Sequence, residues 1–311
     1  MKTMNRSALF SAVQTMSVNG YMLAAIESAL SLLINAAISL NKAGWIKSLG
    51  KLQQWQQMAL NNITSAPFTL FMKGNAKLPF YSWSTLPGVN CPGAGSCFES
   101  IGGKISGWCY SFKAWRYPDA FARQLQNTIM ERGPVYRLQI LKALDKIAGG
   151  SAGPLVPLRL YVDGDFPNLE VLKFWLDTLK QYPRIRAYGY SKSLDLFKQL
   201  NETGYTWPDN YWLNLSSGGK YERGPVADYV KKLPIYRGEF VAVDVPSEIL
   251  KAWKKQQLTR EQSAQIRAQF PNEKIFICPG KCGECTAIQD NPHACGNGDK
   301  FQNMKIVIPV H

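Results

Sequence analysis

The spacing of apolar residues changes twice along the 311-residue chain, and each change marks a different kind of structure. Within residues 8–40 and 45–63, apolar side chains recur at helical intervals, which predicts two or three helices with a break near Asn41. This stretch carries no catalytic motif. We therefore expect residues 1–65 to form a helical extension, which is either a cap on the rest of the chain or a surface that contacts another protein or self-associates.

One run inside this extension, residues 22–40, is long enough to suggest a membrane span. Glu27, Asn35 and three serines interrupt it, and Lys42 and Lys47 follow at once. A buried or partner-facing helix is the favoured interpretation. Because no secretory signal precedes the run either, we expect a cytoplasmic protein that does not cross a membrane.

From residue 67 onward the pattern becomes strand-like. Residues 68–72 and 80–84 have the composition of short strands, and the turn-rich loop LPGVNCPGAGSC follows them. Two helical stretches then begin at Pro118 and Pro134, where proline suits the first turn of a helix.

Beyond residue 157, short apolar runs alternate with helical segments. The predicted strands are residues 158–162, 185–190, 211–216, 240–245 and 274–278, and the predicted helices are residues 169–181, 193–201, 226–232 and 247–269. Such alternation indicates crossover connections between parallel strands. With the strand before Cys91 the count reaches about six. The predicted fold is therefore α/β: a partial (βα)6 TIM-like barrel with an N-terminal helical extension and a C-terminal cysteine-rich loop. The predicted boundaries are 1–65, 66–277 and 278–311.

All seven cysteines fall in two loops rich in Gly and Pro. The upstream cysteines, after the first predicted strand of the barrel, are Cys91, Cys97 and Cys109. The downstream cysteines, with the spacing C-x3-C-x2-C-x9-C after the last predicted strand, are Cys278, Cys282, Cys285 and Cys295. In a reducing cytosol, clustered thiols indicate metal binding rather than disulfides. Zinc and an iron–sulfur cluster both fit, and spacing alone does not separate them. His293 could replace one downstream ligand, although a lone histidine beside a proline is more often solvated.

The net charge and the remaining composition exclude some classes of function but do not select one. The net charge of +14 is spread along the chain and is compatible with nucleic acid, acidic lipid or small anions. No P-loop, G-x-S-x-G or H-E-x-x-H motif is present. With only two histidines, histidine-based catalysis is disfavoured. Rings beside basic residues in SFKAWRYP, residues 111–118, could stack on bases, but core packing is their more usual role.

Several segments are similar to those of a known family: LPGVNCPGAGSC, GWCYSFKAWRYPDAFARQLQNT, LRLYVDGDFPN, AYGYSKS and CPGKCGECTA. They resemble the phage and plasmid family catalogued as gene product 88-like. The resemblance covers roughly residues 86–295 and leaves the N-terminal helices unexplained. It implies an origin in a phage or another mobile element more than an activity.

A more distant resemblance is to the radical S-adenosylmethionine enzymes, whose partial (βα)6 barrel carries a three-cysteine loop after its first strand. An aromatic residue commonly precedes the last cysteine of that loop, as Trp108 precedes Cys109. Two features depart from the pattern: the usual C-x3-C-x2-C spacing occurs only among the downstream cysteines, and no clear Gly-Gly-Glu motif follows the second strand. The resemblance implies a reactive [4Fe–4S] cluster on the upstream cysteines and an auxiliary cluster on the downstream ones.

The candidate cofactor-binding residues lie where predicted strands end, the region in which parallel α/β folds bind ligands. They are Asp163, Asp165, Lys192, Ser216 and Gly218. By the barrel analogy, the two carboxylates bind a cationic group or a ribose, Lys192 binds a phosphate or carboxylate, and the backbone near Gly218 binds an anion. In the plainer interpretation, DGDFP is an Asp-rich turn that caps the helix beginning near Pro167, and SSGG is a glycine turn.

Two functional hypotheses follow from these residues. In the first, the chain is an iron–sulfur protein of mobile-element origin, a radical S-adenosylmethionine-like enzyme that acts on nucleic acid or a nucleotide. In the second, it is a non-enzymatic nucleic-acid-binding protein whose cysteines hold structural zinc.

Overall fold

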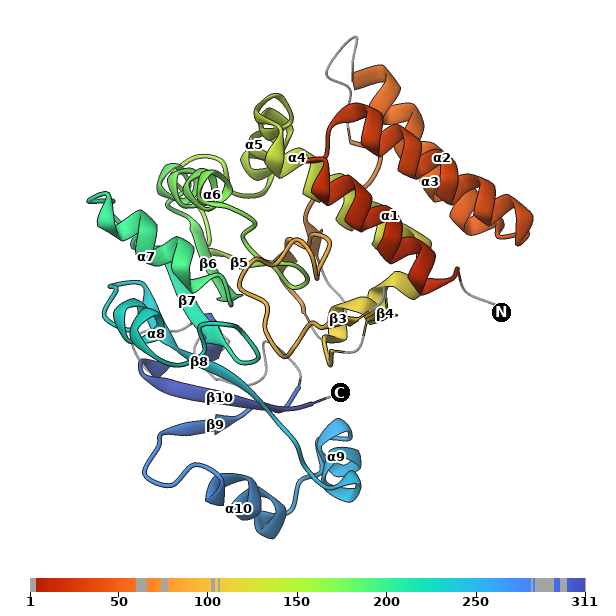
Figure 1. Ribbon diagram of the computed structural model, residues 1–311. Coiled ribbons are helices and arrows are strands. Elements are labelled where there is room, and N and C mark those ends of the chain that lie inside the picture. The colour runs from red at the N-terminus through yellow and green to blue at the C-terminus, as the bar shows by residue number, and fades with distance from the viewer. Residues whose placement is uncertain are drawn as a thin grey trace.

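The computed structural model describes residues 4–59, 66–73, 78–101, 104–105, 107–280, 282, 294–296 and 301–310 (Figure 1). The α-helices within these ranges are α1 (Arg6–Val18), α2 (Leu23–Ser39), α3 (Ala43–Ala59), α4 (Pro118–Arg132), α5 (Pro134–Ala148), α6 (Leu169–Gln181), α7 (Leu194–Glu202), α8 (Pro225–Val230), α9 (Ser247–Lys254) and α10 (Arg260–Ala268). Two 3-10 helices are η1 (Tyr110–Arg116) and η2 (Ala294–Gly296).

The strands form one large sheet and a separate hairpin. They are β1 (Met72–Lys73), β2 (Tyr81–Ser82), β3 (Ser100–Ile101), β4 (Lys104–Ile105), β5 (Val156–Leu160), β6 (Ile185–Ser191), β7 (Tyr211–Ser216), β8 (Tyr236–Val243), β9 (Ile275–Ile277) and β10 (Met304–Pro309). The large sheet has eight described strands in the order β1-β2-β5-β6-β7-β8-β10-β9. Only the β1–β2 pair is antiparallel. The α/β class is confirmed, and the sheet is open, with β1 and β9 at its edges.

Three elements differ from the expectation. The sequence pattern missed β10, which pairs in parallel with both β8 and β9. Of the strand expected over residues 68–72, residues 68–71 do not form a strand, and β1 begins at Met72. The helix expected over residues 247–269 is two helices, because Gln256 takes a left-handed conformation (φ 59°) and Thr259 starts α10 with a capping box to Gln262.

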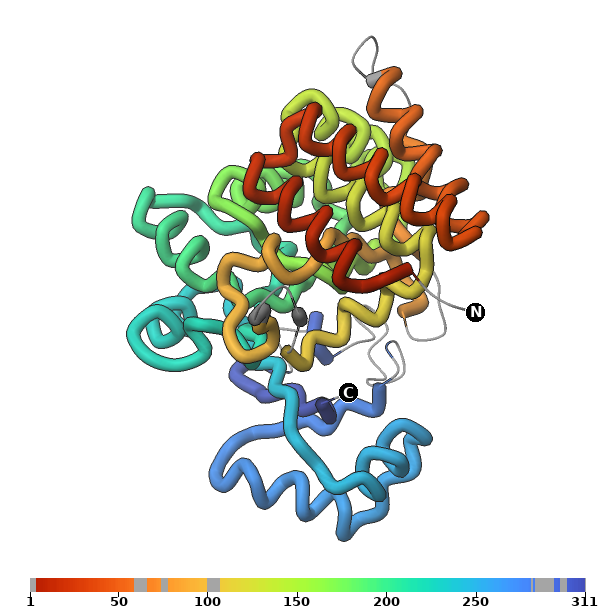
Figure 2. The backbone as a smooth tube through the Cα atoms, turned by 45° about the vertical axis from the view of Figure 1, so that its right-hand side comes forward, coloured from red at the N-terminus to blue at the C-terminus, as the bar shows by residue number. Residues whose placement is uncertain are grey.

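Side chains alternate between the two faces of the sheet, and the faces are covered differently. The first face, with Leu158, Ala187 and Leu213, packs against α-helices in the main core. Further along, Val307 of the same face packs against α9 and α10, which lie at the opposite end of the molecule from α1–α3 (Figure 2). The second face carries aromatic and aliphatic side chains that pack against segments around Phe80, η2 and Phe301. These side chains include Tyr188, Tyr190, Trp212, Phe240 and Ile306.

The N-terminal helices belong to the main core rather than to a detached module. Trp45 of α3 packs on Phe121 of α4, with ring centroids 5.5 Å apart, and Ser48 donates a hydrogen bond to Asp119. The suspected span is α2, whose residues Ile26, Leu30 and Leu33 are buried. Within the described ranges, no helix has both the length and the apolar character needed to cross a membrane.

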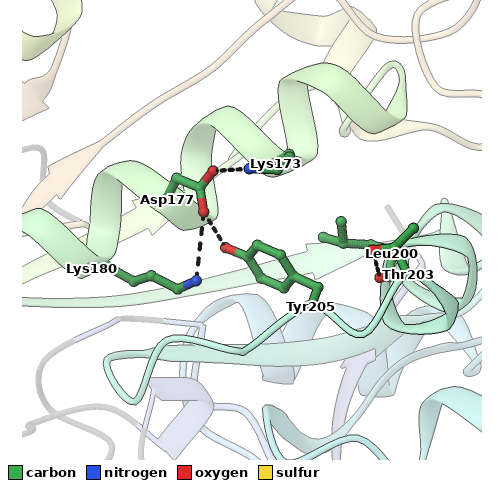
Figure 3. A network of polar contacts seen from close by, with 6 residues as sticks. All are labelled: Lys173, Asp177, Lys180, Leu200, Thr203 and Tyr205. Carbon is green, nitrogen blue, oxygen red and sulfur yellow. Dashed lines mark hydrogen bonds and ion pairs between the residues drawn. The ribbon is translucent and has the colours of Figure 1, made fainter.

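Polar side chains also tie loops to helices on the first face. Asp177 of α6 accepts hydrogen bonds from Lys173 and from the hydroxyl of Tyr205, the latter at 2.8 Å, and it lies 3.6 Å from the Lys180 ammonium (Figure 3). Nearby, Thr203 donates to the carbonyl of Leu200 at 2.7 Å. The connection between α7 and β7 is thereby fixed against α6.

Helix α4 is buried on nearly every side, and its polar side chains serve neighbouring segments. Gln126 bonds the backbone N–H and carbonyl of Phe68, and Thr128 accepts from the N–H of Leu86. Glu131 is 1% exposed and accepts hydrogen bonds from Trp83 and Tyr161. Burial raises the pKa of Glu131 to about 7.

We expect this buried carboxyl to make folding stability pH-dependent. Because its pKa is higher in the folded than in the unfolded chain, its stabilising effect is complete below about pH 4.5 and is lost progressively up to about pH 7. Relative to Glu131→Gln, the wild type should lose on the order of 3 kcal/mol of unfolding free energy across that interval and no more above it. Urea unfolding at pH 5, 6, 7 and 8 measures the difference. Glu170→Gln, which removes a largely exposed carboxylate, is the control, and parallel curves for wild type and Glu131→Gln would contradict the assignment.

Candidate functional site

A cavity of about 80 Å³ lies at the carboxyl ends of the parallel strands, with room for several water molecules. Its lining includes all three upstream cysteines and three of the predicted strand-end residues. These are Cys91, Cys97, Cys109, Asp165, Lys192 and Ser216. The topology therefore brings together side chains from the loop after β2 and from the ends of β5, β6 and β7, as the sequence predicted.

The loop that carries the upstream cysteines is docked onto the turn after β7 by its backbone. The carbonyl of Gly218 accepts from the N–H groups of Gly95 and Cys97, at 3.0 and 3.1 Å. The N–H of Lys220 donates to the carbonyl of Gly93 at 2.8 Å. Within the loop, the N–H of Cys109 donates to the carbonyl of Cys97 at 2.9 Å. These bonds hold Cys97 and Cys109 side by side above the strand ends.

Close backbone approach explains the glycines at this junction. A Cβ atom on Gly93 would lie 1.9 Å from the carbonyl oxygen of Lys192, which is a prohibitive contact. Gly218 has a left-handed φ of 79°, and a Cβ there would lie 2.4 Å from the Trp108 ring and 2.9 Å from Cβ of Cys97. Only glycine satisfies both the conformation and the space.

Asp165 joins the ends of β5 and β6. It is 3% exposed and accepts four hydrogen bonds: from the Ser191 hydroxyl and the N–H of Lys192, both at 2.8 Å, from the N–H of Ser193 at 3.2 Å, and from its neighbour Phe166 at 2.8 Å. Burial still raises its pKa. Asp165 is thus a cross-strand clamp at the cavity rather than a free carboxylate.

Asp163, predicted beside Asp165, lies outside the cavity lining. Its carboxylate accepts from the Gln124 side chain of α4 at 3.0 Å. The intervening Gly164 has a left-handed φ of 83°, which turns the two aspartates in different directions. Neither caps α6: Asn168 does, by accepting from the N–H of Val171 at 2.8 Å.

Lys192 and Ser216 are the polar pair on the cavity wall. The ammonium of Lys192 donates to the Ser216 hydroxyl at 2.7 Å. The predicted anion site at the backbone of Gly218 is already engaged, because that N–H donates to the Glu222 carboxylate at 2.8 Å. The SSGG segment thus serves to dock the cysteine loop, while Lys192 keeps a cation at the cavity.

Two of the three cavity thiols, those of Cys91 and Cys97, are held in their neutral form. Burial raises the pKa of Cys91 well above its usual value, Asp165 and Cys109 raise it further, and Lys192 lowers it by less. Burial also raises the pKa of Cys97, again opposed by Lys192. A metal that binds these sulfurs must therefore displace their protons. Within the described ranges, no three His, Cys, Asp or Glu side chains form a group that could hold a metal ion.

The downstream cysteines occupy a different position. Cys278, Cys282 and Cys295 pack among the aromatic side chains of the second face, and none of the three lines the cavity. Cys285 and His293 lie outside the described residues. Tyr190 lies between the cavity and the downstream cysteines. Its ring stacks on that of Phe240, with ring centroids 4.2 Å apart, and both rings belong to the cavity lining and to the second-face cluster.

A buried arginine anchors the downstream segment to the sheet. Arg237 is fully buried and donates to the Asn214 side chain, at 2.6 Å from Nε, and to the carbonyls of Phe301 and Met304 at 3.1 and 3.2 Å. Asn214 in turn donates to the carbonyl of Cys295 at 3.0 Å. Among the described residues, Arg237 has no carboxylate partner.

Comparison with known families identifies the chain's relatives. The family described as gene product 88 matches residues 49–293, which include α4–α10, every cavity-lining residue except Ile308, and six of the seven cysteines. The chain belongs to this family. No curated protein and no solved structure matches the chain.

The family match extends beyond the expected limit of residue 86, because it begins within α3. Several residues that shape the site were not predicted from the sequence. Tyr190 and Phe240 form cavity walls, and Asn214 and Arg237 bind the downstream segment. A signal did exist for two of them: a polar Asn inside an apolar strand and an Arg at the start of the next are unusual in a buried parallel sheet.

The importance of the close approach at Gly218, where the turn after β7 meets the cysteine loop, can be tested by two matched substitutions. Gly218→Ala and Gly204→Ala both impose a side chain on a positive φ (79° and 76°), but only the methyl group at 218 meets neighbouring atoms. We expect Gly218→Ala to lower the unfolding free energy by about 1–3 kcal/mol more than Gly204→Ala, in the range that overpacking costs. Urea unfolding provides the comparison. Equal losses would show that the close approach at Gly218 is unimportant.

Proposed function

We propose that the upstream cysteines bind a [4Fe–4S] cluster in the cavity at the carboxyl ends of the parallel strands. The observation that supports this is convergence: Cys91, Cys97 and Cys109 all line one cavity, on a loop whose backbone is fixed to the strand ends. Thiolates are the usual ligands of such clusters. The three thiols line the cavity but do not form a metal-holding group as they stand, so cluster binding requires them to rearrange around it.

We further propose that the sheet is the partial (βα)6 barrel of a radical S-adenosylmethionine-like enzyme. Strands β2, β5, β6, β7 and β8 are neighbours in chain order, as in a barrel. Of the described helices α1–α10, those that contact the sheet pack on its first face, whereas doubly wound folds have helices on both faces. Three protein ligands leave one iron of a cubane open, and the cluster would supply electrons and that open coordination position.

Lys192 and Ser216 would bind the anionic part of the cofactor or substrate. Their ammonium–hydroxyl pair, 2.7 Å apart, offers donors suited to a carboxylate or phosphate. Asp165 would keep this pair in place through the backbone N–H of Lys192. The net charge of +14 agrees with a nucleic acid or nucleotide substrate. Base stacking by residues 111–118 has less support, because Phe112 and Trp115 are buried.

Anaerobic purification followed by iron and sulfide analysis tests the cluster. We expect brown protein with iron and acid-labile sulfide, and loss of the cavity cluster in Cys91→Ser, Cys97→Ser and Cys109→Ser, because each change removes one ligand. Ser96→Ala, in the same loop but outside the cavity lining, is the control and should keep the wild-type content. Colourless protein that contains zinc alone, or cysteine variants indistinguishable from Ser96→Ala, would overturn the proposal.

A further inference from the structure

The N-terminal helices contact the cysteine loop on its rear side, by which we mean the side away from the cavity. The contacts lie beside two of the three upstream cysteines. Tyr21, in the turn between α1 and α2, donates a hydrogen bond from its hydroxyl to Oδ1 of Asn90 at 2.6 Å. Asn90 immediately precedes Cys91. Phe10 of α1 packs against Phe98, which immediately follows Cys97, with ring centroids 5.9 Å apart. Two side chains of the helical extension thus contact the neighbours of two cavity thiols.

The Asn90 amide is held in one orientation by donors on two sides. Arg132 of α4 donates to the same Oδ1 at 3.1 Å, and its guanidinium lies 4.8 Å from the centre of the Tyr21 ring. Because arginine has donors only, the atom that faces it must be the amide oxygen. Asn90 is 2% exposed and Tyr21 is 7% exposed, so water competes little for these bonds.

On both sides of the Tyr21–Asn90 contact, the backbone includes a residue with a positive φ angle. Tyr21 adopts a left-handed conformation (φ 57°), which is uncommon for a tyrosine and directs its ring into the protein. In the loop, Gly88 has φ 82°, and the N–H of Cys91 donates to its carbonyl at 2.9 Å, closing a turn that contains Asn90. Phe98 also stacks on the buried Phe112, with ring centroids 5.7 Å apart.

We propose that the turn between α1 and α2 is a positioning element of the site: Tyr21 fixes Asn90, and thereby the place of Cys91 at the cavity. Its effect on cluster binding rests on the proposed function, whereas its effect on the exposure of the Cys91 thiol does not. Tyr21 is a positioning residue, since it contacts no group that would bind the cluster.

The test compares Tyr21→Phe with Tyr182→Phe. Each variant removes the hydroxyl of a buried tyrosine. The Tyr182 hydroxyl donates to Asp145 at 2.7 Å, which links α5 to the end of α6 away from the cysteine loop. The measurement is the rate at which iodoacetamide alkylates Cys91 in metal-free protein, followed by peptide mass spectrometry. We expect Tyr21→Phe to raise this rate about fivefold, because the loop opens more often when the hydrogen bond is lost. A fivefold change corresponds to the net free energy that one hydrogen bond contributes. Tyr182→Phe should stay close to wild type.

The outcomes separate this inference from the cluster proposal. A faster rate in Tyr21→Phe alone supports the positioning role whether or not the wild type binds iron. Equal rates in the two variants at matched loss of stability would overturn it. Where the wild type does hold a cluster, Tyr21→Phe should lose it to oxygen faster than Tyr182→Phe. Equal oxygen sensitivity would also count against the positioning role.

Discussion

The site depends on one close contact, the approach of the cysteine-loop backbone to the turn after β7. The loop meets that turn through the carbonyl of Gly218, which accepts two N–H groups, and through the carbonyl of Gly93. A side chain on Gly218 would collide with Trp108 and Cys97 of the loop, and one on Gly93 would collide with the backbone of Lys192 at the end of β6. Without these bonds, the loop between β2 and η1 would lose its attachment to the strand ends, and with it the gathering of Cys91, Cys97 and Cys109.

At the cavity next to this contact, the charge of Lys192 favours an anionic occupant, whereas burial opposes charge on the thiols. Burial keeps the Cys91 and Cys97 thiols neutral, and Lys192 is the cation that opposes this effect. On the second face, fully buried Arg237 is satisfied by neutral oxygens and has no carboxylate partner among the described residues. A metal–thiolate centre is anionic, so these two cations lie where such a centre would be stabilised electrostatically.

Much of the fold could be predicted from local pattern, and the exceptions have physical causes. The strand-end rule placed Lys192 and Ser216 at the cavity because parallel strands share one edge. The same rule grouped Asp163 with Asp165. Left-handed conformations at Tyr161 and Gly164 break the regular alternation there and send the two carboxylates to different partners, α4 and β6. Similarly, pattern alone cannot show that β10 lies between β8 and β9, because order along the chain does not determine order in a sheet.

The role of the N-terminal helices also could not be predicted from the sequence pattern, because a hydrogen bond between Tyr21 and Asn90 leaves no periodic signal. The structure gives a reason for it. A loop that borders a cavity on one side can be packed tightly only from the other. Glycines bring the front of this loop onto the strand ends, while Tyr21 and Phe10 hold its rear. Residues 4–39, which precede the family match, thus contribute rigidity to a loop that lies inside it.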